Sequence, residues 1–169
     1  MMAGTTIRKR MLYSMRVLLA AALLLAPLWV QAQSAAGLSA ADKHAISSYS
    51  FNEDNFKRLV GATREAHTMG LRQKQFDYSQ VHSLDDLANL VVDQDPRARP
   101  LLQKYGFTPR EYLLANLALM NAGMVVQAKA QPEARQYVDK SRVNPANVSF
   151  YEAHEQQIAQ LQSELADGK

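Results

Sequence analysis

The chain has 169 residues, of which 47% are hydrophobic and 21% are charged. This length suits one domain, and this composition is typical of a folded globular protein, so it excludes a mostly disordered chain. The sequence contains no cysteine. That excludes disulfides, thiolate metal sites, covalently attached haem and a cysteine nucleophile. A lipid anchor is not expected either, because a lipoprotein leader is cleaved at a cysteine.

The net charge of +3 comes from the N-terminal segment. Residues 1–32 contain no acidic side chain and four basic ones, namely Arg8, Lys9, Arg10 and Arg16. Of the 19 basic residues, 15 then remain against 16 acidic ones, which leaves a net charge of about −1 on the rest of the chain. Because a phosphate backbone is recognised by clustered positive charge, nucleic acid is not an expected partner.

Residues 1–32 have the pattern of a secretory signal peptide. The basic residues precede an apolar run over 17–30, and Val30-Gln31-Ala32 places small residues at a cleavage site. A helix that crosses a bilayer needs about 20 apolar residues, and this run has only about 14. We therefore predict cleavage after Ala32 and a periplasmic protein that keeps no stable membrane anchor.

The first residues after the leader offer little to bury, since they are mostly Ser, Ala, Gly and Gln. We predict a flexible lead-in over 33–44 and a helical domain over 45–167. The sequence Ser50-Phe51-Asn52-Glu53 has the form of a capping box and predicts a helix over 53–74. Apolar residues at steps of three and four predict that this helix buries one face.

Two shorter helices are expected next. Ser83 is a candidate cap for a helix whose first turn holds Asp85 and Asp86, where carboxylates complement the positive helix end. The expected buried face of this helix comprises Leu84, Leu87, Leu90 and Val91. Another short helix is predicted to begin at or near Pro100 and to end at Gly106.

The strongest local pattern is Thr108-Pro109-Arg110-Glu111, with a capping threonine, a proline at the first helical position and a glutamate at the third. It predicts a helix over 109–130. This segment is apolar on nearly every side, so we predict that it is the central helix. Its small residues allow neighbouring helices to approach closely; they are Ala115, Ala118, Ala122 and Gly123.

Residues 133–138 are expected to form a turn or two of helix. Asn144-Pro145 repeats the pattern of cap and proline and predicts a terminal helix that ends at Asp167-Gly168, with apolar residues at heptad-like steps. No apolar and polar residues alternate over a run long enough for a strand. The predicted fold class is all-α, a single-domain helical bundle of about four main helices plus short connecting helices.

Asn116 and Asn121 are the candidate site residues, because they lie in the most apolar segment of the chain. A buried amide without a partner is costly, so each needs a hydrogen bond. One interpretation is a bond to a neighbouring helix or a partly exposed helix face. The other is a polar contact in a ligand pocket between helices.

No cofactor or metal is expected. His67-Thr68-Met69 offers nitrogen and sulfur to copper, and Met120 and Met124 lie one turn apart, as haem ligands in a bundle can. Methionines on an Ala- and Leu-rich helix usually fill gaps in the core, however. The four histidines also show no metal-ligand spacing; they are His44, His67, His82 and His154.

No catalytic motif is present in the sequence. It lacks the Gly-x-Ser-x-Gly elbow, the His-Glu-x-x-His pattern and a glycine-rich phosphate loop. Asp85 and Asp86 are adjacent carboxylates, but their place at a helix N-terminus explains them.

Two stretches of the sequence are similar to a group of known proteins. Residues 46–56 (ISSYSFNEDNF) and 105–121 (YGFTPREYLLANLALMN) resemble small exported helical proteins of Gram-negative bacteria. The resemblance covers much of residues 44–130. It implies export and an all-helical fold. It implies no site residue, because the shared motifs are capping and packing patterns.

The leading functional hypothesis is a non-enzymatic periplasmic protein that binds another protein or a small apolar ligand, first of all around residues 112–126. The alternative is an enzyme, or a bundle that binds haem or metal, whose site is formed when folding brings together Glu65, His67 or His154. A helix that lies on membranes is the weakest hypothesis, since the helices lack a face rich in Lys and Arg.

Overall fold

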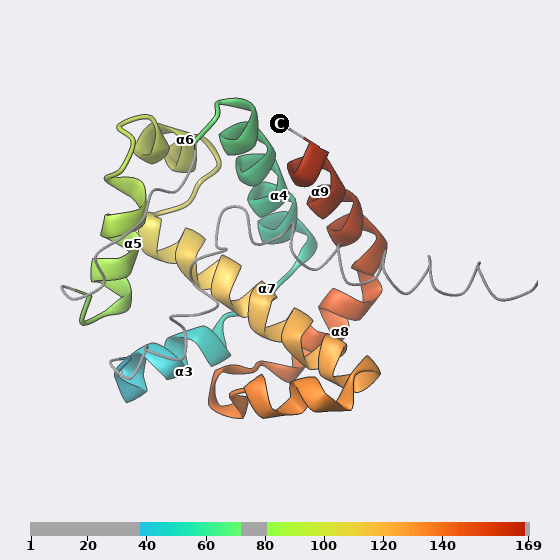
Figure 1. Ribbon diagram of the computed structural model, residues 1–169. Coiled ribbons are helices and arrows are strands. Elements are labelled where there is room, and N and C mark those ends of the chain that lie inside the picture. The colour runs from blue at the N-terminus through green and yellow to red at the C-terminus, as the bar shows by residue number, and fades with distance from the viewer. Residues whose placement is uncertain (1–37, 72–80, 168–169) are drawn as a thin grey trace, which may run out of the picture.

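The structure is a computed structural model that describes residues 38–71 and 81–167. All secondary structure in these ranges is helical and forms one packed body (Figure 1), which confirms the predicted all-α fold class. The predicted signal peptide, residues 33–37 of the lead-in and residues 72–74 of the first expected helix lie outside the described residues. The elements are α3 (Ala40–Ser48), α4 (Glu53–Thr68), α5 (Leu84–Val92), α6 (Ala98–Lys104), α7 (Pro109–Ala130), η3 (Pro132–Tyr137), η4 (Lys140–Arg142), α8 (Pro145–Ala153) and α9 (Glu155–Asp167).

Helix α7 is the central helix, as predicted. It packs against α3, α4, α5, α6, α8 and η3, and in Figure 1 it runs diagonally through the body. Every residue from 112 to 128 is buried or half-buried. By length and composition α7 is also apolar enough to cross a bilayer, but a core helix packed on all sides has the same composition.

The capping patterns of α5 and α7 form as predicted. Ser83 Oγ accepts a hydrogen bond from Asp86 N at 3.1 Å. At the start of α7, Thr108 Oγ1 accepts from Glu111 N at 3.1 Å, and Glu111 Oε2 accepts from Thr108 N at 2.8 Å. Both caps satisfy backbone N–H groups that have no partner inside the helix, so these helices begin where the sequence predicts.

The predicted capping box at Ser50 and Glu53 is wrong, because the cap of α4 is Asn52. Asn52 Oδ1 accepts from Asn55 N, and Asn55 Oδ1 accepts from Asn52 N, both at 2.9 Å. Ser50 has another partner, since its Oγ accepts from Asn144 Nδ2 at 3.1 Å. A contact between segments distant in sequence therefore displaces the cap that the local pattern favoured.

Helix α3 begins at Ala40, inside the range 33–44 for which a flexible lead-in was expected, so that expectation is wrong from residue 40 on. Ser39 caps the helix by accepting from Asp42 N at 3.0 Å. Ile46 is 1% exposed and packs against residues of α5 and α7. Contacts with residues distant in sequence therefore stabilise α3, although most of its own residues are small or polar.

The buried face of α5 differs in part from the expected one. Leu84 and Leu87 are buried as predicted, but Leu90 and Val91 are half-buried, and Ala88 and Val92 are buried instead. The short helix before Gly106 begins two residues ahead of Pro100, at Ala98. Gly106 ends this segment with a φ of +69°, a conformation that glycine adopts without strain.

The predicted terminal helix is broken into α8 and α9 at His154, so the prediction of one continuous helix is wrong. The imidazole of His154 stacks on Phe150 with ring centroids 3.9 Å apart, and its Nδ1 lies 2.8 Å from Phe150 O. Its Nε2 lies 3.0 Å from Glu53 Oε1. After this break α9 packs against α4, where its buried residues are Ile158, Leu161 and Leu165.

Gly123 of α7 allows the close approach that the sequence predicted. A Cβ at this position would lie 2.9 Å from Cε2 of Tyr151. This distance is shorter than the contacts that Cβ atoms make in proteins. Helix α8 therefore lies against α7 with the ring of Tyr151 over a residue that has no side chain.

Asn147 of α8 is the most deeply buried amide among the described residues, at 1% exposure. Its Oδ1 accepts from Phe51 N at 2.9 Å, and its Nδ2 donates to Tyr49 O at 2.8 Å. One side chain thus satisfies two backbone groups of the connection between α3 and α4. It fixes that connection to the C-terminal part of the fold.

Substitution Asn147→Leu should lower the free energy of unfolding by about 2–3 kcal/mol, because it leaves Phe51 N without its partner and removes one of the two donors to Tyr49 O, which still accepts from Asn144 Nδ2. Urea denaturation of the two proteins measures this loss. The control is Asn121→Leu, which removes a single hydrogen bond to Arg142 O. It should cost about 1 kcal/mol, and equal losses from the two variants would contradict the assignment.

Candidate functional site

A cavity of about 80 Å³ lies between the end of α4, the second half of α5, α6 and the first half of α7. In Figure 1 α5 and α6 lie next to each other, near the start of α7. Ten of its fourteen lining residues are apolar; they are Ala66, Leu71, Ala88, Val91, Val92, Ala98, Leu101, Leu102, Pro109 and Leu113. The other four are Gln94, Asp95, Tyr112 and Asn116.

The turn between α5 and α6 forms one rim of this cavity, and arginines hold it in place. Arg97 Nη2 binds Asp95 Oδ2 at 2.6 Å, and its Nη1 donates to Met69 O at 3.1 Å. Arg99 Nη2 binds Asp93 Oδ1 at 2.7 Å. The bond to Met69 ties the turn to the end of α4, so two walls of the cavity are connected at its rim.

Tyr112 and Asn116 are one turn apart on α7 and form a polar part of the wall. The Asn116 Nδ2 donates to Tyr112 O at 2.7 Å. The hydroxyl of Tyr112 lies 3.5 Å from Thr63 Oγ1, which is at the limit of a hydrogen bond. Burial raises the pKa of the Tyr112 phenol, so this group is a neutral hydrogen-bond donor at pH 7.

The structure places the two candidate asparagines in different surroundings. Asn116 lines the cavity, which is the position that the pocket interpretation requires. Asn121 donates from Nδ2 to Arg142 O at 3.2 Å and joins α7 to η4, which is the interpretation as a bond between elements. A ligand contact at Asn116 stays a prediction, whereas the structural role of Asn121 is directly visible.

Folding does not bring together Glu65, His67 and His154, the groups named for an acid and base site. Both oxygens of Glu65 bind Lys104 Nζ, at 2.8 and 2.6 Å, and Tyr105 donates to Glu65 Oε2 at 2.8 Å. These bonds lower the pKa of Glu65. His154 instead lies at Glu53, twelve residues earlier on α4, which corresponds to about 18 Å along the helix.

Met120, one of the two candidate haem ligands on α7, lies in an ordinary structural position. Met120 is half-buried and packs against the core cluster formed by α3, α5 and α7, as expected for a methionine that fills a gap in the core. Within residues 38–71 and 81–167, no three side chains of His, Asp or Glu gather as metal ligands would.

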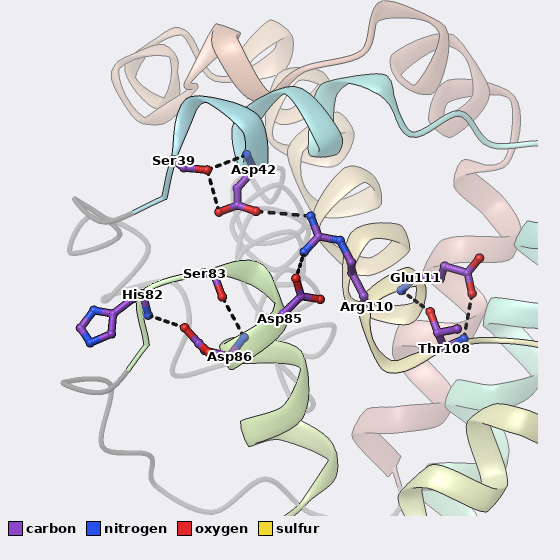
Figure 2. A network of polar contacts seen from close by, with 9 residues as sticks. All are labelled: Ser39, Asp42, His82, Ser83, Asp85, Asp86, Thr108, Arg110 and Glu111. Atoms are coloured by element: carbon purple, nitrogen blue, oxygen red, sulfur yellow. Dashed lines mark hydrogen bonds and ion pairs between the residues drawn. The ribbon is translucent and has the colours of Figure 1, made fainter.

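Arg110 is at the centre of a polar network that sequence reasoning missed (Figure 2). Its Nη1 binds Asp85 Oδ2 at 2.7 Å, and its Nη2 binds Asp42 Oδ1 at 3.3 Å. The hydrogen bond to Asp85 raises the pKa of the Arg110 guanidinium. One side chain of α7 thus joins α3 to α5, and α5 is a wall of the cavity. In the sequence, Arg110 is only the residue between Pro109 and Glu111 of a capping box.

Comparison with known proteins gives no match: no family model, no curated protein and no solved structure is similar to this chain. The resemblance of residues 46–56 and 105–121 to exported helical proteins therefore stays an expectation. The cavity and the residues around it are therefore the features of this protein that bear on its function.

The caps shown in Figure 2 predict that acid destabilises the fold. Hydrogen bonds from Thr108 lower the pKa of Glu111 below 4.5, and bonds from Ser83 and His82 lower that of Asp86 below 3.8. A carboxylate with a lower pKa in the folded state stabilises the fold above its unfolded pKa, and this contribution is lost as the pH falls. The melting temperature should therefore fall between about pH 5 and pH 2.

The variant Glu111→Gln tests the assignment, because glutamine keeps the reach of the capping box without its charge. It should reduce the dependence of the melting temperature on pH in this window. Glu133→Gln, at an exposed position of η3, is the control. An unchanged pH dependence in Glu111→Gln would show that the cap does not couple the folding of α7 to protonation.

Proposed function

We propose that this protein is an exported, non-enzymatic binding protein that takes a small apolar molecule into the cavity between α4, α5, α6 and α7. The cavity itself carries the proposal. Protein interiors are packed as densely as organic crystals, and voids larger than a water molecule are few. A hollow of about 80 Å³ with ten apolar lining residues is therefore a natural place for a ligand.

The volume of the cavity limits the size of the ligand. An engineered apolar cavity that binds benzene has a volume of about 150 Å³, and this one has about half of that. The cavity is partly open to solvent, so part of a ligand can protrude. The proposed ligand is thus a molecule with a single small ring, or with a short chain, rather than a large lipid.

The proposal includes export to the periplasm, for which the leader pattern of residues 1–32 is the support. The resemblance to exported helical proteins points the same way. The remaining chain carries almost no net charge, which suits neither nucleic acid nor an anionic membrane surface. No observation on the described residues favours the alternative of an enzyme or a cofactor-binding bundle, because Glu65 and His154 have separate structural partners.

Cleavage after Ala32 can be read directly from the purified protein. Expressed in full length in a Gram-negative host, it should be recovered from the periplasm, and N-terminal sequencing should begin at Gln33. Recovery of a chain that still carries residues 8–16, or its confinement to the cytoplasm, would contradict export.

The cavity is tested by filling it. Toluene, used as the probe, should shift the amide resonances of residues that line the cavity, with a Kd of the order of 1 mM for seven heavy atoms. In Ala98→Leu the added side chain occupies the cavity, so these shifts should disappear while the melting temperature stays the same or rises.

The matched control is Ala159→Leu, the same substitution on the exposed side of α9. It should bind toluene as the unmodified protein does. Toluene binding that persists in Ala98→Leu would place the ligand elsewhere, and an unmodified protein that shows no shifts would overturn the proposed function.

A further inference from the structure

We infer that the ligand of this cavity is electrically neutral and carries one hydrogen-bonding group, which the side-chain amide of Asn116 holds. The inference rests on the proposed function, since it names the chemical class that the same cavity accepts. It follows from the charges in the cavity wall and from the hydrogen-bonding capacity of Asn116.

The lining contains no cation that could pair with an anionic ligand. None of the fourteen lining residues is Lys, Arg or His, and the acidic one is Asp95. The neighbouring arginines have partners, because Arg97 binds Asp95 and Met69 O, and Arg110 binds Asp85 and Asp42. Burying an unpaired carboxylate or phosphate against apolar side chains costs several kcal/mol, so this cavity selects against anions.

A cationic ligand is disfavoured for a related reason. The carboxylate of Asp95 already binds Arg97 with two hydrogen bonds, Oδ1 to Nε at 2.9 Å and Oδ2 to Nη2 at 2.6 Å. A second cation at Asp95 would have to compete with a guanidinium that also holds the rim of the cavity. The wall therefore offers neither sign of charge to a ligand, and a neutral molecule is the class that fits.

Asn116 supplies the specific polar contact. A side-chain amide has two N–H donors and two acceptor lone pairs. The structure uses one of the two donors for Tyr112 O, at 2.7 Å. The amide therefore keeps hydrogen-bonding capacity that a ligand can use. Because the lining residues on α5 and α6 themselves are apolar, a ligand group at Asn116 gains a hydrogen bond that these two helices do not supply.

The difference between phenol and toluene tests this inference, because the two molecules have nearly the same shape and differ in one hydroxyl group. Titration with phenol should shift the side-chain NH₂ resonances of Asn116 further than titration with toluene, whose ring acts on them only through its ring current. In Asn116→Leu the Kd for phenol should rise about fivefold, the value of one ordinary hydrogen bond, while the Kd for toluene changes less than twofold. Benzoate should bind the unmodified protein at least tenfold more weakly than phenol.

Asn121→Leu is the matched control, since it removes the other asparagine of α7, which bonds to Arg142 O away from the cavity. It should leave the Kd for phenol unchanged. The resonances of Asn116 in the unmodified protein give a readout that does not depend on whether Asn116→Leu folds.

The outcomes separate the two proposals. If neither toluene nor phenol binds, the proposed function fails. If both bind but Asn116→Leu affects them equally, or if phenol and toluene shift the Asn116 side-chain resonances alike, the assignment of the polar contact is wrong. If benzoate binds as tightly as phenol, the selection for neutral ligands is wrong while the cavity remains a binding site.

Discussion

The fold depends on one constraint, which is that α7 has no polar side. Its 22 residues extend for about 33 Å, and a helix that is apolar nearly all round gains from burial in every direction. The helices that cover it are shorter, between six and sixteen residues. Several of them are needed to surround it, so the structure consists of short helices around one long axis rather than four helices of equal length.

Local patterns predicted the caps of α5 and α7, and they failed for features that involve contacts between distant residues. Thr108 and Ser83 cap through residues three positions away, so the sequence identifies them. Helix α3 has a local cap at Ser39, but Asp42 is bound by Arg110, 68 positions away. His154, where the terminal helix breaks, lies at Glu53, 101 positions away. No pattern in a short window contains such a pair, because only the folded chain brings the two residues together.

The candidate site could be predicted only in part, for the same reason. The sequence identified Asn116 and Asn121 as amides in an apolar helix, and both needed a partner. Which of them faces a cavity is decided by the packing of α4, α5 and α6 on α7, because the lining residues come from these four separate helices and the turns next to them. The two asparagines lie five positions apart and so point in different directions from the helix axis. Because of this difference in direction, Asn121 bonds to another part of the fold, whereas Asn116 lines the cavity and is a candidate ligand contact.

The position of Asp42 has a consequence for the order in which the chain assembles. Its partner Arg110 is made 68 residues later, and the leucines of α5 and α7 around Ile46 also follow it in the chain. During synthesis from the N-terminus, α3 therefore has no surface to dock on until α7 has been made. The first described helix is therefore among the last to find its place, and it has no tertiary partner while most of the residues between it and α7 are being made.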